Sequence, residues 1–192
     1  AEARQAYAAG KIQKIDLLDI EQQAYHSSGT CTFYGTANTN QLIAEAMGFQ
    51  LPGAAFTPTE SPVREYLKKE SLEALIRLMD AGIGLGEMLD IKNWMNALIV
   101  LLASGGSTNL VIHLIAMARS AGYILTIEDF NDLSRIIPLL CQVYPNGTAD
   151  VNEFHSEGGI ARLLSNLMEG DLIYNDIETV AGFGLESYTK IP

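Results

Sequence analysis

The chain has 192 residues, of which 12 are Lys or Arg and 23 are Asp or Glu, so its formal net charge at pH 7 is −11. This acidic balance argues against nucleic acid and anionic membranes as partners, because both select basic surfaces. Hydrophobic residues make up 48% of the chain, too many for a disordered protein, and the length suits one domain, or part of a larger one, with a real core. The two cysteines are too few for a disulfide scaffold or a complete four-cysteine metal site.

The chain begins with Ala1 and with polar, helix-favouring residues, and it lacks the charged, apolar and cleavage-site regions of a secretory signal peptide. We therefore expect a cytoplasmic protein. We expect 1–192 to be one helix-rich segment whose ends are cut from a longer parent, although removal of an initiator Met would also explain Ala1.

The first half of the chain is predicted to be mostly helical. Residues at helical spacing indicate a helix over 15–26. A loop rich in Ser, Gly and Thr follows over 27–36. The next helix is predicted from about 39 to 47, with Asn38 as its N-cap and Gly48 as its stop.

Two further helix starts are clear in the sequence. Residues 49–60 contain two prolines and are predicted to form a loop. Ser61 and Pro62 then begin a helix that should run to about Asp80, because a capping residue followed by Pro is a strong start signal. After three closely spaced glycines, Asp90 is predicted to cap the next helix.

The stretch from Asn93 to Ala118 contains no charged residue and could be mistaken for a membrane span. Its centre, 104–109, is polar, and the apolar run before it, 94–103, is too short to cross a bilayer. We interpret the stretch as two buried helices joined by a polar turn, the second running over 107–120.

The last third is predicted to contain two short strands, at 123–125 and 139–144. A helix lies between them and opens with a capping box formed by Thr126 and Asp129. A Pro-Asn-Gly turn follows the second strand, and a final helix is predicted over 158–169.

The most unusual stretch is GTCTFYGTAN, residues 29–38, in which Cys31 lies among small and hydroxylated residues just before a helix. Backbone N–H groups and the helix dipole lower the pKa of such a thiol and favour the thiolate. The alternative is a buried, inert cysteine, the commoner fate of a lone cysteine. Any metal would need ligands from outside the segment. Cys141 lies in the apolar run 136–143 and is interpreted as structural.

A second candidate is the turn Gly105-Gly106-Ser107-Thr108-Asn109, which opens a long apolar helix. Glycines permit close backbone approach, and a helix start offers N–H groups to a carboxylate or phosphate. The alternative is a glycine turn between packed helices, with Ser107 as N-cap. We expect His113, one turn further, to be a core histidine rather than a ligand.

The order of several stretches resembles the iron–sulfur dehydratases of hydroxy acids and sugar acids. The joint match covers nearly the whole chain and is specific, although each piece alone would be weak. The stretches are SSGTCTFYGTANTNQLIAEAMG (27–48), LPGAAF (51–56), LLASGGSTNLVIHLIAMARSAG (101–122), EDFNDLS (128–134), PLLCQVYPNGTADVNEFHSEGG (138–159) and TVAGFG (179–184).

This resemblance implies a predominantly α segment with a few short strands, part of an α/β N-terminal domain that bears the cluster, with the C-terminal domain absent. It implies a lyase with a 4Fe–4S cluster, acting as a homodimer. A cluster iron would assist loss of the 3-hydroxyl, a base would remove the proton from carbon 2, and the enol would relax to a 2-keto acid. The isolated segment is expected to be inactive and to bind no cluster by itself.

The resemblance also assigns roles to particular residues. Cys31 matches the third cluster cysteine of the family, and the other two would lie before Ala1. We hypothesise that Ser107, Thr108 or Asn109 binds a substrate anion at the helix N-terminus. The family's proposed catalytic base lies in the C-terminal domain, outside the chain.

Two motifs separate branches of the family. At the cysteine this chain has CTFYGTAN, where the family's enzymes of branched-chain amino-acid synthesis usually have a CGGMYTAN-like motif. At the later turn it has Tyr144-Pro145-Asn146-Gly147, where those enzymes usually have KPSG. Both differences favour the branch whose substrate is a sugar-acid phosphate of the Entner–Doudoroff pathway. The alternatives are a dihydroxy-acid dehydratase and a cofactor-free binding module.

Overall fold

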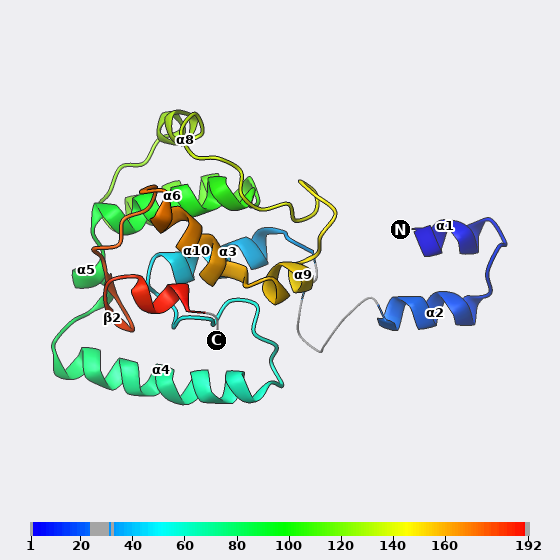
Figure 1. The fold of residues 1–192 in the computed structure, drawn as a ribbon, viewed down its shortest axis with the longest axis horizontal. Coiled ribbons are helices and arrows are strands. Elements are labelled where there is room, and N and C mark those ends of the chain that lie inside the picture. Colours follow the sequence, from blue (N-terminus) through cyan, green and yellow to red (C-terminus); the bar gives the residue numbers. More distant parts are fainter. Residues whose placement is uncertain (1, 24–30, 32, 191–192) are drawn as a thin grey trace.

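A computed structural model describes residues 2–23, 31 and 33–190, and this part of the chain is mostly helical (Figure 1). It contains one sheet, made of two short antiparallel strands, so the predicted fold class is confirmed. The helices are α1 (Glu2–Ala8), α2 (Lys14–Gln23), α3 (Thr36–Ala46), α4 (Pro62–Asp80), α5 (Leu85–Met88), α6 (Ile91–Ser104), α7 (Asn109–Ser120), α8 (Ile127–Leu133), α9 (Val151–Ser156), α10 (Gly159–Glu169) and the 3-10 helix η1 (Glu186–Thr189), and the strands are β1 (Glu178–Thr179) and β2 (Gly182–Phe183).

The first two helices pack against each other and lie apart from the other helices in Figure 1. Arg4 Nε and Glu21 Oε1, 2.7 Å apart, form an ion pair between them. The predicted helix over 15–26 corresponds to α2, and residues 24–26 lie outside the described part of the chain.

The helix-start signals in the middle of the chain are confirmed. Ser61 Oγ accepts a hydrogen bond from Arg64 N at 3.1 Å and caps α4, which ends at Asp80 as predicted. Asp90 caps α6. The backbone N of Thr126 donates to Asp129 Oδ2 at 2.7 Å, which is half of the predicted capping box of α8. In each case a side chain satisfies backbone groups that a helix terminus leaves free.

Two predicted helix starts are wrong, because each helix begins two or three residues away from the predicted start. α3 begins at Thr36 after Gly35, so Asn38 lies inside its first turn, buried. α7 begins at Asn109 after Thr108, so Ser107 is not its N-cap. The backbone N of Ser107 donates instead to Thr39 Oγ1 at 3.0 Å, in another helix.

Both predicted strands are also wrong. Residues 123–125 form neither a strand nor a helix. In 139–144, the N–H groups of Leu140 and Cys141 instead donate to the Ala103 carbonyl at 2.7 and 3.2 Å. An apolar run becomes a strand only where a partner strand is available, and the sheet forms near the C-terminus from β1 and β2. Helices α5 and α9 were not predicted.

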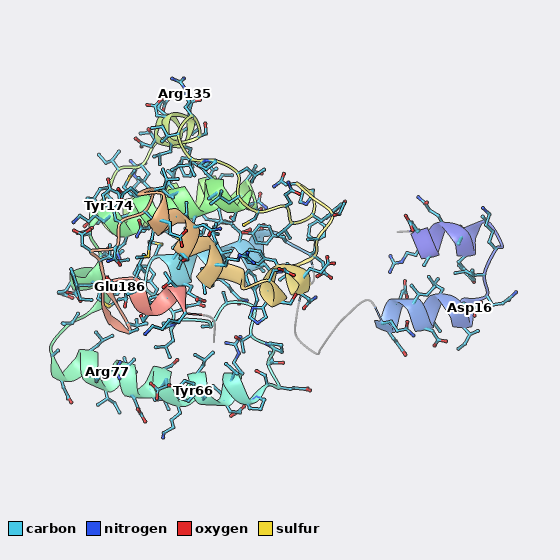
Figure 2. All side chains as sticks on the ribbon, in the orientation of Figure 1. Asp16, Tyr66, Arg77, Arg135, Tyr174 and Glu186 are labelled. Atoms are coloured by element: carbon cyan, nitrogen blue, oxygen red, sulfur yellow. The ribbon has the colours of Figure 1, made fainter. Side chains whose placement is uncertain are left out.

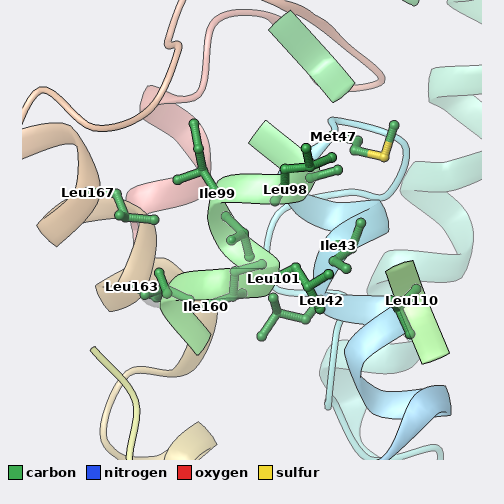
Figure 3. Close-up of a cluster of buried hydrophobic side chains, with 14 of the residues drawn as sticks. Leu42, Ile43, Met47, Leu98, Ile99, Leu101, Leu110, Ile160, Leu163 and Leu167 are labelled. Carbon is green, nitrogen blue, oxygen red and sulfur yellow. The ribbon is translucent and has the colours of Figure 1, made fainter. Parts of the chain in front are cut away.

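The core lies around α6, which packs against α3, α7 and α8, while α10 packs against α3, α9 and η1. Figure 3 shows leucine and isoleucine side chains of α3, α6, α7 and α10 gathered there. This packing fixes the start of α3 beside the turn that joins α6 to α7. The labelled residues are Leu42, Ile43, Met47, Leu98, Ile99, Leu101, Leu110, Ile160, Leu163 and Leu167.

The charge-free stretch forms two helices joined by a turn, as predicted, but only α6 is buried over most of its surface. α7 buries Leu110, Leu114 and Ala118 and leaves Ile112 71% exposed. His113 is exposed on the same helix, so its assignment to the core is wrong. Among the described helices, none has the length and apolar character needed to cross a membrane.

Candidate functional site

The structure brings together the first turn of α3 and the turn between α6 and α7. Asn109 Nδ2 donates to Thr36 Oγ1 at 2.7 Å, and the hydroxyls of Thr36 and Ser107 are 3.2 Å apart. The two stretches singled out in the sequence therefore share one network of hydroxyl and amide groups. Thr108 lies in the same turn and is exposed.

The two glycines of this turn allow the close approach. A Cβ at Gly106 would lie 2.5 Å from Thr39 Cγ2 and 2.8 Å from Leu101 Cδ1. Gly105 has a φ of 61°, and its carbonyl accepts from Asn146 Nδ2 at 2.7 Å. Close packing and backbone conformation are thus sufficient to explain why both positions are glycine. The role of Ser107, Thr108 and Asn109 in binding an anion stays a prediction, and the Ser107 N–H already has an acceptor.

Cys31 is exposed, contrary to the buried alternative. Its backbone carbonyl accepts from Asn38 Nδ2 at 2.7 Å, and the same amide donates to the Phe33 carbonyl at 2.7 Å. The Phe33 ring meets the Tyr144 ring edge-on, with centroids 5.4 Å apart. These contacts position Cys31 and Phe33 against α3 and against the Pro-Asn-Gly turn. Cys141 is buried as predicted, and burial raises its pKa to about 11.

Tyr34, which follows Phe33, is anchored in the core. Its hydroxyl donates to Ser104 Oγ at 2.8 Å in a buried pair, and Ser104 Oγ in turn donates to the Leu101 carbonyl at 3.3 Å. Burial raises the pKa of Tyr34 well above its usual value, so the group stays a neutral donor.

A cavity of about 170 Å³ lies beside Cys31, and we call it the Cys31 cavity. Its walls come from α3, from the loop before α4, from the first turn of α4 and from the start of α9. The lining residues are Cys31, Ala37, Asn38, Gln41, Phe56, Thr57, Thr59, Arg64, Val151 and Asn152. The sequence did not predict this cavity, because its walls are far apart along the chain.

A buried carboxyl group holds one wall of the cavity. Glu45 is fully buried in α3, where Oε1 accepts from Gly53 N and Oε2 from Ala55 N, both at 2.6 Å. Burial raises the pKa of Glu45 to about 7, although the N–H bonds and nearby Arg64 act in the opposite direction. From the other side, Arg64 Nη2 donates to the Ala54 carbonyl at 3.0 Å and to the Thr57 carbonyl. An acidic residue between apolar neighbours in AEAMG was the available sequence signal.

Cys31 is the residue at this site that suits an iron–sulfur centre. Within the described residues, no group of three or more His, Cys, Asp or Glu side chains could hold a metal ion. An exposed thiol at a cavity, on a loop held by side-chain hydrogen bonds, fits a single ligand of a centre completed by other residues.

Residues 1–188 match the family described as Dihydroxy-acid/6-phosphogluconate dehydratase N-terminal. Because the match covers nearly the whole sequence, the chain belongs to this family.

Two of its relatives are phosphogluconate dehydratases. That of Escherichia coli (strain K12) is 47% identical over 192 residues, and that of Zymomonas mobilis is 45% identical over 192 residues. A dihydroxy-acid dehydratase of Sulfurisphaera tokodaii is 39% identical over 195 residues. These alignments cover 98%, 98% and 100% of the chain, but 32%, 32% and 35% of the relatives. The chain thus spans about a third of their length.

Proposed function

We propose that the chain is the cluster-bearing, N-terminal part of a hydro-lyase that removes water from 6-phospho-D-gluconate and yields 2-dehydro-3-deoxy-6-phosphogluconate, in the Entner–Doudoroff pathway. The observation that carries this proposal is the exposed Cys31 thiol at a cavity, in a chain that aligns over almost its whole length with phosphogluconate dehydratases. The lower identity to the dihydroxy-acid dehydratase, 39% against 47%, favours the phosphorylated substrate.

In the proposed enzyme, Cys31 is one thiolate ligand of a 4Fe–4S cluster, and cysteines outside this chain supply the others. When bound, the cluster supplies Lewis-acid stabilisation of the hydroxyl that leaves from carbon 3. Asn38 fixes the Cys31 carbonyl and thereby the loop that presents the thiolate. The base that takes the proton from carbon 2 lies outside the chain.

We also propose that the full-length enzyme is a cytoplasmic homodimer. Support for the dimer comes from apolar side chains on α4 that the described residues leave uncovered, with Tyr66 60% and Leu72 63% exposed. Figure 2 shows Tyr66 on this helix. A face of this kind suits contact with the rest of the enzyme or with a second copy.

The activity is tested by producing the full-length protein without oxygen and measuring the 2-keto acid formed from 6-phospho-D-gluconate and, separately, from a branched 2,3-dihydroxy acid. We expect turnover of the sugar-acid phosphate, and no turnover by residues 1–192 alone. Preference for the branched acid would assign the protein to the dihydroxy-acid dehydratases instead. Robust dehydration by the isolated segment would contradict the proposed division of the active site.

A further inference from the structure

The helix α4 has apolar side chains on two opposite sides. Leu67 and Ala74 are buried on the inner side, where they pack with Leu51. On the outer side, large apolar residues recur at the spacing i, i+3, i+4 and i+7, so they form one continuous strip over the last two turns. Each of them is between 52% and 69% exposed among the described residues. We call this surface the α4 strip, and its residues are Leu72, Leu75, Ile76 and Met79.

The position of α4 makes its outer side available for contact with another surface. In Figure 1 this helix lies along one edge of the described part of the chain. A helix that faces water on its outer side normally carries polar residues there. A group of exposed apolar side chains on such a side marks a contact with another protein surface. The α4 strip therefore has the character of an interface.

The charges of α4 favour a second copy of the chain as the occupant. The net charge of −11 makes two copies repel each other in general. The helix α4, however, contains four basic and four acidic residues and has no net charge. Two of its ion pairs lie within the helix, Lys68 with Glu65 at 2.5 Å and Lys69 with Glu73 at 3.6 Å. This helix can therefore meet its own copy without the repulsion that an acidic surface would produce.

The order of the charges along α4 sets the direction of the pairing. Lys69 precedes the α4 strip and Asp80 follows it, and both residues are exposed. Parallel pairing about a two-fold axis would place each of these charges against itself. Antiparallel pairing places Lys69 beside Asp80 of the partner subunit, at the negative end of the partner helix. The same pairing sets Leu75 opposite Ile76 of the partner subunit.

We propose that two copies of the full-length enzyme associate through the α4 strip, with the two α4 helices packed antiparallel across a two-fold axis. The inference rests on the proposed function, which includes a homodimer, and it assigns the surface and the direction of the contact. Burial of the apolar side chains supplies the affinity, and the contacts between Lys69 and Asp80 at the rim fix the direction.

The test is sedimentation of the full-length protein over a range of concentrations, with circular dichroism as the measure of folding. Ile76→Glu keeps a helix-favouring residue but places a carboxylate from each copy at the apolar contact. We expect a folded monomer at concentrations at which the wild type is a dimer, and a dissociation constant raised about 100-fold or more. Ile112→Glu is the matched control, because Ile112 is an isoleucine of α7 that is 71% exposed, and this variant should remain a dimer.

An exchange of the two rim charges tests the direction of the pairing. Lys69→Glu and Asp80→Lys should each weaken the dimer by about threefold or more, because each places like charges at two symmetric contacts. The double variant should recover the affinity of the wild type. A double variant no tighter than the weaker single variant would overturn the antiparallel arrangement.

Each remaining outcome of the sedimentation test has one meaning. A dimer that survives Ile76→Glu would overturn the assignment of the interface to α4. Loss of folded structure in Ile76→Glu would show that another part of the same chain covers the α4 strip, which also overturns the proposal. A monomeric wild type would contradict the proposed dimer itself. Absence of turnover of 6-phospho-D-gluconate would count against the proposed activity, a separate result.

Discussion

Glu45 is fully buried, and its two carboxylate oxygens accept hydrogen bonds from the loop before α4, which lines the Cys31 cavity. Its pKa is raised from 4.5 to about 7, so the folded state holds this proton more tightly than the unfolded state does. The stabilisation is complete below the unfolded-state pKa and is lost as the pH rises through the folded-state pKa. Glu45 therefore makes the protein less stable as the pH rises from about 4.5 to about 7.

We predict that Glu45→Gln abolishes this pH dependence. The free energy of unfolding of the wild type should fall, relative to the variant, by on the order of 1–3 kcal/mol between about pH 5 and about pH 8. Denaturant unfolding at a series of pH values measures the difference. Glu65→Gln, at an exposed glutamate on α4, is the control and should follow the wild type. Parallel curves for wild type and Glu45→Gln would show that the buried carboxyl does not bind its proton as described.

At the scale of single residues, the sequence predicted the environment of Cys141 but not that of His113. Cys141 lies in a run of apolar residues whose pattern is sufficient to predict burial. His113 has equally apolar neighbours, yet it falls on the exposed side of α7. An apolar helix does not reveal which of its faces the chain covers, since that depends on the neighbouring helices.

The contact between α3 and the turn after α6 depends on Gly106. A Cβ there would overlap Thr39 Cγ2 and Leu101 Cδ1, and the backbone N–H of Ser107 would lose its alignment with Thr39 Oγ1. We predict that Gly106→Ala destabilises the protein by about 1–3 kcal/mol, as overpacking in a close contact does. The midpoint of denaturant unfolding gives the value.

Gly86→Ala is the matched control for this change. A Cβ at Gly86, in the short helix α5, meets no atom within 4 Å, so the variant should differ from the wild type by less than about 0.5 kcal/mol. Equal stability of Gly106→Ala and Gly86→Ala would mean that α3 and the turn do not approach as closely as described.

At the scale of elements, local chemistry predicted the helices that begin with their own capping side chains. The starts of α4, α6 and α8 follow from Ser61, Asp90 and Thr126 with neighbours no more than three residues away. The starts of α3 and α7 could not be placed this way, because the Asn38 amide donates to the Cys31 carbonyl and the backbone N of Ser107 donates to another helix. The predicted strands failed for the same reason: pairing is a property of two segments.

At the scale of the whole molecule, the site is assembled from segments that the sequence identifies separately but cannot bring together. The motifs around Cys31 and Gly105 were found from residue type, and the network through Thr36 joins them. The Cys31 cavity was not predictable, because Arg64 and Asn152 reach it only through the packing of the loop before α4 against α9.

Cys31, and not Cys141, is the proposed ligand of the cluster in the full-length enzyme. The most direct test is iron and acid-labile sulfide analysis of the full-length protein, prepared without oxygen, with Cys31→Ser compared with Cys141→Ser. We predict that Cys31→Ser loses most of its iron, sulfide and dehydratase activity together, because a hydroxyl is a poor replacement for a thiolate ligand. Cys141→Ser should keep the cluster. An intact cluster in Cys31→Ser, or the same loss in both variants, would contradict the assignment of Cys31 as a cluster ligand.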